Sequence, residues 1–247
     1  MQPPPLPFQL DTLQGVLSRC RSLTAAGRTP PLVVFDLDAT LYDHRPRTLQ
    51  ILMEYAQSVR GRMPEVATKL ATLDDTRLQP HLADTLQSCG VGHPAVVQEA
   101  TAYWSERFDD EGYLDKDLAI EGGPEFVQDC YHLGACIAYL SGRDLASTLV
   151  ATSRSLLQDG FPLGLPGVQL VLKASRDLPD DVFKREAMDA LTRTGHVVGF
   201  FAADVGECAY AAGHHRDAQV GLVELYGHIA PQDPPPGVVG MSDFRRV

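Results

Sequence analysis

The sequence lacks the features that mark membrane and secreted disulfide-rich chains. No apolar run approaches the ~18 residues that a membrane-spanning helix needs. The first residues, MQPPPLPFQL, contain neither a basic stretch nor an apolar core, so we expect no secretory signal. The 5 cysteines are odd in number and form no CxxC pair. They indicate free thiols in a reducing compartment, and we expect a cytoplasmic protein without a membrane partner.

Basic residues are also few. The chain has 21 Lys and Arg against 32 Asp and Glu, which gives a formal net charge of −11. Binding to a phosphate backbone needs clustered Lys and Arg, so bulk nucleic-acid binding is not expected. With 247 residues, 44% of them hydrophobic and 21% charged, the composition is that of a globular protein with a sizeable core.

Short apolar segments alternate with amphipathic helical segments through most of the chain. The segments that suit buried strands are 32–35, 135–140, 168–172, 197–202 and 219–225, and the helical segments are 8–26, 124–133, 144–158, 181–193 and 207–214. This alternation predicts a parallel sheet with helices on both faces, a Rossmann-like, doubly wound α/β fold. Residues 231–240 are expected to form a turn-rich tail.

Residues 44–118 differ from the rest because they contain helical patterns and no convincing strand. A structureless loop of that length would be improbable, so the segment is predicted to be a helical insertion between the first and second strands. The sequence thus predicts a core domain of residues 1–43 and 119–247, and a helical cap of residues 44–118.

Side chains with phosphoryl-transfer chemistry follow the predicted strands. The first strand is followed by Asp36-Leu37-Asp38-Ala39-Thr40 and the second by Ser141-Gly142-Arg143, while Lys184 begins a helix and Asp204 follows the fourth strand. Ligands bind beyond the carboxyl ends of such strands. There, one Asp can attack a phosphoryl group and a second carboxylate can transfer protons. Oxygens of Asp36 and Asp204 and the main-chain carbonyl of Asp38 suit Mg²⁺.

These segments together resemble a known superfamily. FDLDATLYD, YLSGRD, Lys184 and FFAADVGE are similar to the four ordered motifs of the haloacid dehalogenase-like (HAD) hydrolases. YLSGRD, GFPLGLP and Phe183-Lys184 also resemble the acid-phosphatase-type members. The resemblance covers residues 32–43 and 119 to about 225.

The resemblance implies a role for each matching residue. Asp36 would be the nucleophile and a Mg²⁺ ligand, Asp38 the general acid/base, and Lys184 the cation that steadies the intermediate. Asp204 would complete the metal site. Thr40 would brace the first loop, and the expected substrate-binding residues are Thr40, Ser141, Gly142 and Arg143. The implied function is Mg²⁺-dependent hydrolysis of a small phosphorylated metabolite, a phosphomonoester, through an aspartyl-phosphate.

Two positions depart from the pattern. Ala39 stands where the superfamily often has Gly, and a small residue is expected to suffice there. Cys208 stands four residues after Asp204, where a second acid is often found, so Glu207 is the nearby candidate for a contact with the metal through water.

Several alternatives stay open at this stage. Lys173 also follows a strand and competes with Lys184. Arg45 and Arg47 either clamp an anionic part of the substrate or face water at a helix start. A phosphotransferase or mutase would use the same residues, and a non-catalytic phospholigand-binding protein is a further alternative. A dehalogenase is disfavoured because it usually lacks the second Asp of the first motif, here Asp38.

Overall fold

The computed structural model describes residues 7–27, 29–175, 177–226 and 234–246. These residues form two compact units, which are described separately. The core unit contains the described residues of 1–43, 119–225 and 231–247, and the helical unit contains those of 44–118 together with Tyr226. Tyr226 therefore groups with the helical unit, although the sequence analysis assigned it to the core domain.

The core unit is built on a six-stranded sheet in which every neighbouring pair is parallel. Its strand order is β5-β4-β1-β6-β7-β8. The strands are β1 (Pro31–Phe35), β4 (Cys136–Asp144), β5 (Val168–Lys173), β6 (His196–Ala202), β7 (Gln219–Val223) and β8 (Val238–Met241). The first strand, β1, lies in the middle of the sheet, and successive strands are added on one side of it and then on the other. In open α/β sheets, ligands bind at the point where the direction of strand addition reverses.

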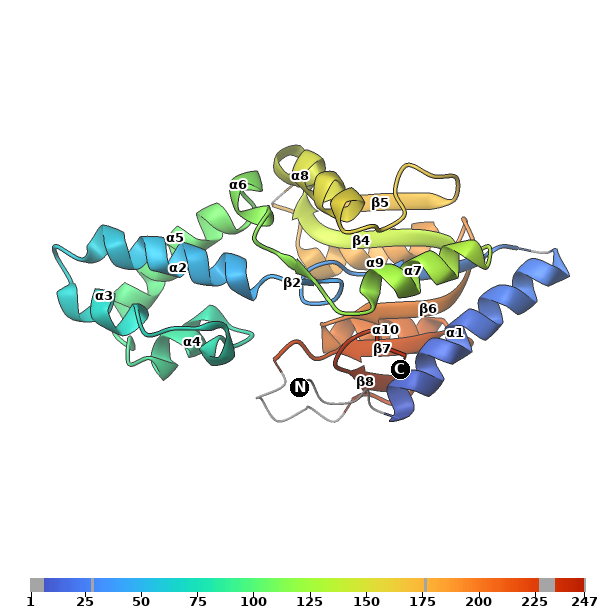
Figure 1. Cartoon of the computed structure of the whole chain (residues 1–247), viewed down its shortest axis with the longest axis horizontal. Helices are drawn as coiled ribbons and strands as arrows, with labels where there is room; N and C mark the ends of the chain where they lie inside the picture. Colours follow the sequence, from blue (N-terminus) through green and yellow to red (C-terminus); the bar gives the residue numbers. More distant parts are fainter. Residues whose placement is uncertain (1–6, 28, 176, 227–233, 247) are drawn as a thin grey trace. The chain divides into compact units, whose positions relative to one another are not determined.

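Helices pack on both faces of this sheet (Figure 1). They are α1 (Pro7–Ala26), α7 (Gly123–His132), α8 (Leu145–Gln158), α9 (Asp180–Leu191) and α10 (Val205–His214). Alternate residues of β1 enter different hydrophobic clusters: Val33 and Phe35 pack with α1 and α7, whereas Leu32 and Val34 pack with α9 and α10. A central strand covered on both faces explains the unbroken apolar run in the sequence. The Rossmann-like, doubly wound fold predicted from the sequence is confirmed.

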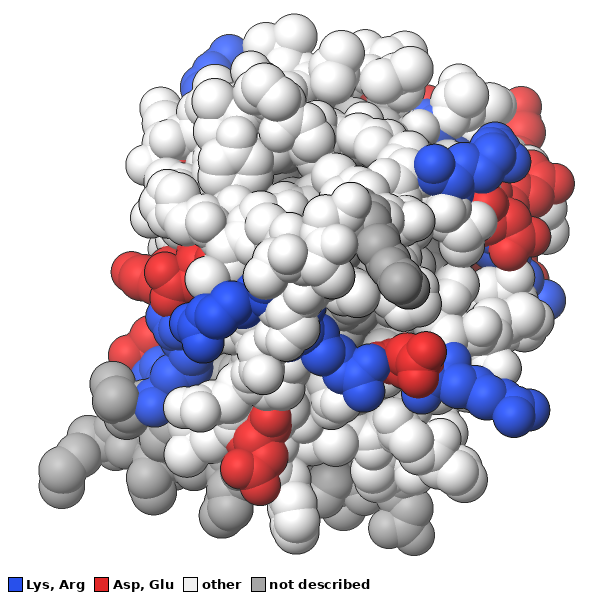
Figure 2. Space-filling view, turned by 90° about the vertical axis from the view of Figure 1, so that its right-hand side faces the viewer, with Lys and Arg blue, Asp and Glu red and all other residues white. Residues whose placement is uncertain are grey.

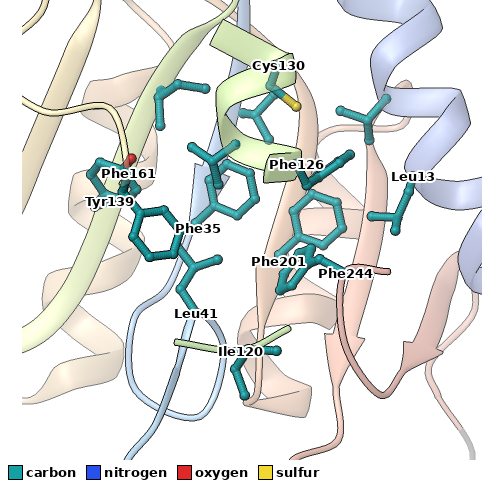
Figure 3. Packing of buried hydrophobic residues seen from close by; sticks show 14 of the residues in the cluster. Leu13, Phe35, Leu41, Ile120, Phe126, Cys130, Tyr139, Phe161, Phe201 and Phe244 are labelled. Carbon is teal, nitrogen blue, oxygen red and sulfur yellow. The ribbon is translucent and has the colours of Figure 1, made fainter. Parts of the chain in front are cut away.

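Aromatic rings fill the centre of the first cluster (Figure 3). Phe35 of β1 stacks on Phe201 of β6, with ring centroids 5.2 Å apart. Phe126 of α7 meets Phe201 edge-on at 5.6 Å, and Phe244 stacks on Phe126 at 5.7 Å. These contacts hold β1 and β6 rigidly side by side. The residues that directly follow the two strands are therefore also held at a fixed distance from one another.

The helical unit has its own hydrophobic core. Its elements are α2 (Arg45–Val59), α3 (Pro64–Leu70), the 3-10 turn η1 (Asp75–Arg77), α4 (Leu82–Ser88), α5 (Pro94–Phe108) and α6 (Glu111–Leu114). Proline stands in the first turn of α2, α3 and α5, where its missing N–H costs no helical hydrogen bond. Short strands β2 (Tyr42–Asp43) and β3 (Leu118–Ala119) flank the unit in sequence.

Two sequence expectations need correction. Residues 238–240, predicted as the end of a turn-rich tail, belong to β8, which pairs in parallel with β7; residues 231–233 of that stretch lie outside the described residues. Ser141-Gly142-Arg143, predicted to follow the second strand, belongs to β4, whose pairing with β5 becomes irregular between Ser141 and Asp144. The irregularity turns this end of β4 away from regular pairing and allows its side chains to converge on the first loop.

The described part of the chain contains no helix that is both long enough and apolar enough to cross a bilayer. On the face shown in Figure 2, basic and acidic side chains lie interspersed, and no broad basic area occurs among the described residues drawn there.

Candidate active site

Asp36 and Asp204 follow the two central strands of the sheet. β1 and β6 are parallel neighbours, and the Asp36 N–H donates to the carbonyl of Phe201 at 2.9 Å. Asp36 is 8% exposed. Asp204 lies two residues beyond β6 and caps α10, because its Oδ1 accepts from the N–H of Glu207 at 2.8 Å. The sheet therefore brings two of the predicted carboxylates to one edge.

The loop after β1 closes as a tight turn. The carbonyl of Leu37 accepts from the N–H groups of Thr40, Leu41 and Tyr42. Ala39 has φ of 60°, a left-handed conformation that favours glycine, which is the physical reason to expect Gly at this position.

Thr40 packs inside this loop. Its side chain is fully buried, and its hydroxyl makes no hydrogen bond with any described residue. Its backbone N–H donates to the Leu37 carbonyl at 3.1 Å, so the main chain of Thr40 takes part in the turn. The expected contact of Thr40 with a substrate stays a prediction.

Lys184 joins the first and fourth motifs. Its Nζ lies 3.1 Å from Asp36 Oδ1 and 2.8 Å from Glu207 Oε1. The lysine is 8% exposed, on the fifth residue of α9. Lys173 instead pairs with Asp180. Of the two lysines left open by the sequence, Lys184 is the one that contacts Asp36.

Burial and mutual charge shift the titration of this group. Burial raises the pKa of Asp36; Lys184 opposes the rise, and the charge of Asp38 adds to it. Burial and the charge of Asp36 raise the pKa of Glu207 to about 7, against the opposing effect of Lys184. Burial disfavours the charged form of Lys184, but Asp36 and Glu207 outweigh it and raise the pKa of the lysine. Asp36 and Glu207 thus share one ammonium, and burial disfavours the charged form of both carboxyls.

The second motif lies close to α9. Ser141 is buried, and its Oγ accepts from the N–H of Arg143 at 3.3 Å. A Cβ added to Gly142 would lie 2.5 Å from Asp180 Oδ2, so a larger residue at this position would have to displace the Asp180 side chain. Asp180 therefore lies where the sequence expects a phosphate contact, and Lys173 neutralises it.

Arg143 forms a bidentate ion pair with Asp38. Its Nε donates to Oδ2 and its Nη2 to Oδ1, each at 2.8 Å. The Arg143 side chain is 1% exposed, whereas that of Asp38 is 22% exposed. The structure brings Asp38 together with Arg143, which the sequence had assigned to the substrate.

A cavity of about 280 Å³ opens beside these groups within the core unit. Lys184, Asp204 and Glu207 contribute to its lining, which continues along α9 and α10 with Asp181, Arg185 and Tyr210. A cavity of this size suits a small ligand.

The donor set fits Mg²⁺ in its chemistry. Among the described residues, no three His, Cys, Asp or Glu side chains are grouped to hold a metal ion. The predicted set does not need three, because it combines the carboxylates of Asp36 and Asp204 with the carbonyl of Asp38, and Mg²⁺ commonly takes one or two carboxylates and keeps several waters. The surplus of carboxylates over cations near Lys184 favours a divalent cation.

Two neighbouring sequence positions take other roles. Cys208 is fully buried, with Sγ 3.7 Å from the carbonyls of Ala202 and Gly221, and burial raises the pKa of its thiol. Glu207 binds Lys184 with both oxygens, at 2.8 and 3.0 Å. The expected contact of Glu207 with the metal through water stays a prediction beside this direct contact with Lys184.

In the helical unit, the side chain of Arg47 is occupied by contacts within the protein. It is fully buried, its Nε lies 3.0 Å from Asp117 Oδ1, and its Nη1 donates to the carbonyl of Phe108 at 2.8 Å. The guanidinium also lies 3.8 Å from the centre of the Phe108 ring. The idea that Arg47 clamps an anionic substrate is wrong for this arrangement. Arg45 is only partly buried.

Sequence reasoning missed the partners of Asp38 and Lys184. Both partners lie far away in the chain: Arg143 is 105 residues from Asp38, and Glu207 is 23 from Lys184. One local signal existed for Glu207, because Asp204-x-x-Glu207 has the spacing of a helix-capping pair and predicts that both acids lie in the first turn of α10.

Comparison with known proteins identifies the fold. No family model and no curated protein matches the sequence. Among solved structures, one from Clostridium difficile described as a candidate phosphatase is similar with TM-score 0.50 and 15% identity, over 79% of this chain and 85% of that one.

A structure described as a dehalogenase has TM-score 0.47 and 14% identity, over 87% of this chain and 93% of that one. The class C acid phosphatase from Bacillus anthracis with tungstate bound has TM-score 0.44 and 18% identity, over 81% of this chain; this chain spans 65% of that enzyme's length. The protein has a HAD-like fold, as its four motifs predicted.

Proposed function

We propose that this protein hydrolyses a small phosphomonoester through an aspartyl-phosphate on Asp36. The observation that carries the proposal is the contact of Lys184 with Asp36, 3.1 Å, at the edge where Asp204 also lies. A buried cation beside a carboxylate would neutralise the charge of a phosphoryl group as it approaches that carboxylate. Asp38, partly exposed, lies two residues away and supplies a second carboxylate.

The chain's own residues account for both halves of the reaction. Asp36 Oδ bonds to phosphorus as the bond to the leaving oxygen breaks, and protonated Asp38 gives its proton to that oxygen. A water oxygen then bonds to phosphorus as the Asp36–phosphorus bond breaks, and the Asp38 carboxylate takes the proton of the water. Asp36, Asp204 and the carbonyl of Asp38 would hold Mg²⁺, which supplies positive charge to the phosphoryl oxygens when bound.

The test is a phosphatase assay with a generic aryl phosphate, followed by a panel of phosphorylated metabolites. We expect turnover with Mg²⁺ and its loss in a chelator. Asp36→Asn removes the nucleophilic charge at nearly constant size and should abolish turnover, while Asp159→Asn, a change at an exposed acid that ends α8, should not. Wild-type rates for Asp36→Asn, or full activity in the chelator, would contradict the mechanism.

The two lysines give a matched pair. Lys184→Met should lower kcat by on the order of 10²-fold or more because it removes a preorganised charge beside Asp36. Lys173→Met breaks only the pair with Asp180 and should cost far less. A larger loss for Lys173→Met would reverse the assignment. Adding an acceptor alcohol to the assay and measuring transferred phosphate separates hydrolysis from the phosphotransferase alternative.

A further inference from the structure

We propose that Arg143 is a positioning residue that holds the Asp38 carboxylate in its working orientation, and that it does not bind the substrate phosphate. The inference rests on the proposed function and adds a role for a residue that the sequence motif alone assigns to the substrate.

The first support is the geometry of the pair. Two parallel N–H···O bonds of 2.8 Å join Nε and Nη2 of Arg143 to the two oxygens of Asp38. A bidentate pair fixes both the distance and the plane of the carboxylate, which a single hydrogen bond or a lysine does not. The two nitrogens that would grip a phosphate are therefore engaged.

The second support is the way in which Arg143 is itself held. Its Nη1 donates to Thr152 Oγ1 of α8 at 3.2 Å, and its Cζ lies 5.6 Å from the centre of the Tyr42 ring. Thr152 and Tyr42 are fully buried. Residues of α8 and β2 thus hold the guanidinium in place independently of Asp38. It can therefore act as a rigid support for the Asp38 carboxylate.

The third support is the asymmetry of burial. Arg143 is 1% exposed and Asp38 22% exposed, so the arginine is closed off while the carboxylate stays open to a ligand. The backbone of Asp38 is fixed by the turn in which the Ala39 N–H donates to the Tyr42 carbonyl at 2.8 Å. The turn fixes the main chain and Arg143 fixes the side chain, which together leave one direction for the carboxylate.

The consequence for the reaction falls mainly on its second half. In that half the Asp38 carboxylate takes a proton from the attacking water, so its oxygens must be held toward that water. Without Arg143 the carboxylate would rotate and activate water poorly. When the leaving group needs no proton, Asp36 would still be phosphorylated, and the covalent intermediate would then accumulate.

The experiment compares Arg143→Ala and Arg143→Lys with wild type on dinitrophenyl phosphate in Mg²⁺, by rapid mixing and by mass measurement of acid-quenched enzyme. We expect Arg143→Ala to release one phenolate per active site in a burst, then to turn over about 10²-fold more slowly with one phosphoryl group on the protein. Arg143→Lys should restore part of the rate. Arg154→Ala, at an exposed arginine of α8, is the matched control and should behave as wild type.

Other outcomes would overturn the inference. If Arg143 binds phosphate, Arg143→Ala should raise KM and the inhibition constant of inorganic phosphate together, with no burst and no phosphorylated protein. If wild type hydrolyses no phosphate ester, the proposed function fails. The pairing is then tested by thermal unfolding of Asp38→Asn, Arg143→Met and the double variant. If the losses in melting temperature of the two single variants are not additive in the double variant, Asp38 and Arg143 interact as proposed. Additive losses refute the pairing.

Discussion

The core unit and the helical unit each contain a buried arginine paired with an aspartate, and the two pairs differ in how much of the acid stays open. In the core unit, the side chain of Asp38 is 22% exposed beside Arg143; in the helical unit, that of Asp117 is 1% exposed beside Arg47. A pair with one open carboxylate can still act on a ligand. A pair that is closed on both sides can only support the surrounding structure. The same residue types therefore leave one acid accessible to a ligand in the core unit and close both partners off in the helical unit.

The largest effect is expected from the core pair. Asp38→Asn keeps the size of the side chain but removes the proton-transfer group, so kcat on an alkyl phosphate should fall by about 10²- to 10⁴-fold. The loss should be smaller on dinitrophenyl phosphate, whose leaving group needs no proton. Steady-state rates on the two substrates measure this difference. An equal loss on both would indicate that Asp38 does not protonate the leaving group.

The helical pair should give a stability effect instead. Asp117→Asn removes the negative charge beside the buried Arg47, and breaking a buried ion pair typically costs about 3–5 kcal/mol. Chemical denaturation of the full chain should show this loss. The double variant Arg47→Met with Asp117→Leu removes both charges and should recover much of it. A stability unchanged by Asp117→Asn would show that the pair does not hold the unit together.

These two pairs also show where sequence reasoning stops. The strands around Asp36 could be predicted because a central parallel strand is apolar on both faces, and the motifs follow it directly. The partners of Asp38 and Arg47 could not, since Arg143 and Asp117 are chosen by the tertiary fold. β8 was missed for a local reason: Val238–Met241 is only four residues long and follows PPPG, which signals a turn.

A smaller effect concerns the charge balance of the two regions. The helical pair balances one charge with another, whereas Glu207 is subject to the negative charges of Asp36 and Asp204 and to the positive charge of Lys184. Burial raises the pKa of Glu207 from 4.5 to about 7, so between these values the folded state holds a proton that the unfolded state has lost. Stability should then fall as pH rises from about 4.5 to 7, by up to a few kcal/mol.

Unfolding curves at several pH values in a chelator measure this slope. Glu207→Gln removes the titrating carboxyl and should flatten the dependence of stability on pH. In wild type, Mg²⁺ should reduce the fall in stability with rising pH by offsetting the negative charge. A stability that rises over the same interval in the chelator would contradict the assigned direction of the Glu207 shift.

The smallest effect comes from the backbone of the loop after β1. Ala39 has φ of 60°, and among the described residues it is the one non-glycine with a positive φ; in the helical unit, Gly90 takes the comparable conformation with φ of 82°. The left-handed conformation costs a residue with a Cβ about 1–2 kcal/mol, while glycine loses about 0.5–1 kcal/mol of extra chain entropy on folding. Ala39→Gly should therefore stabilise the protein by up to about 1 kcal/mol. Ala102→Gly, at an exposed position inside α5, should destabilise it by a similar amount because the helix gains no such relief. The free energies of unfolding of both variants are measured in denaturant. Changes of opposite sign would establish that Ala39 is held in a conformation that alanine disfavours, and changes of equal sign would show that Ala39 is not strained.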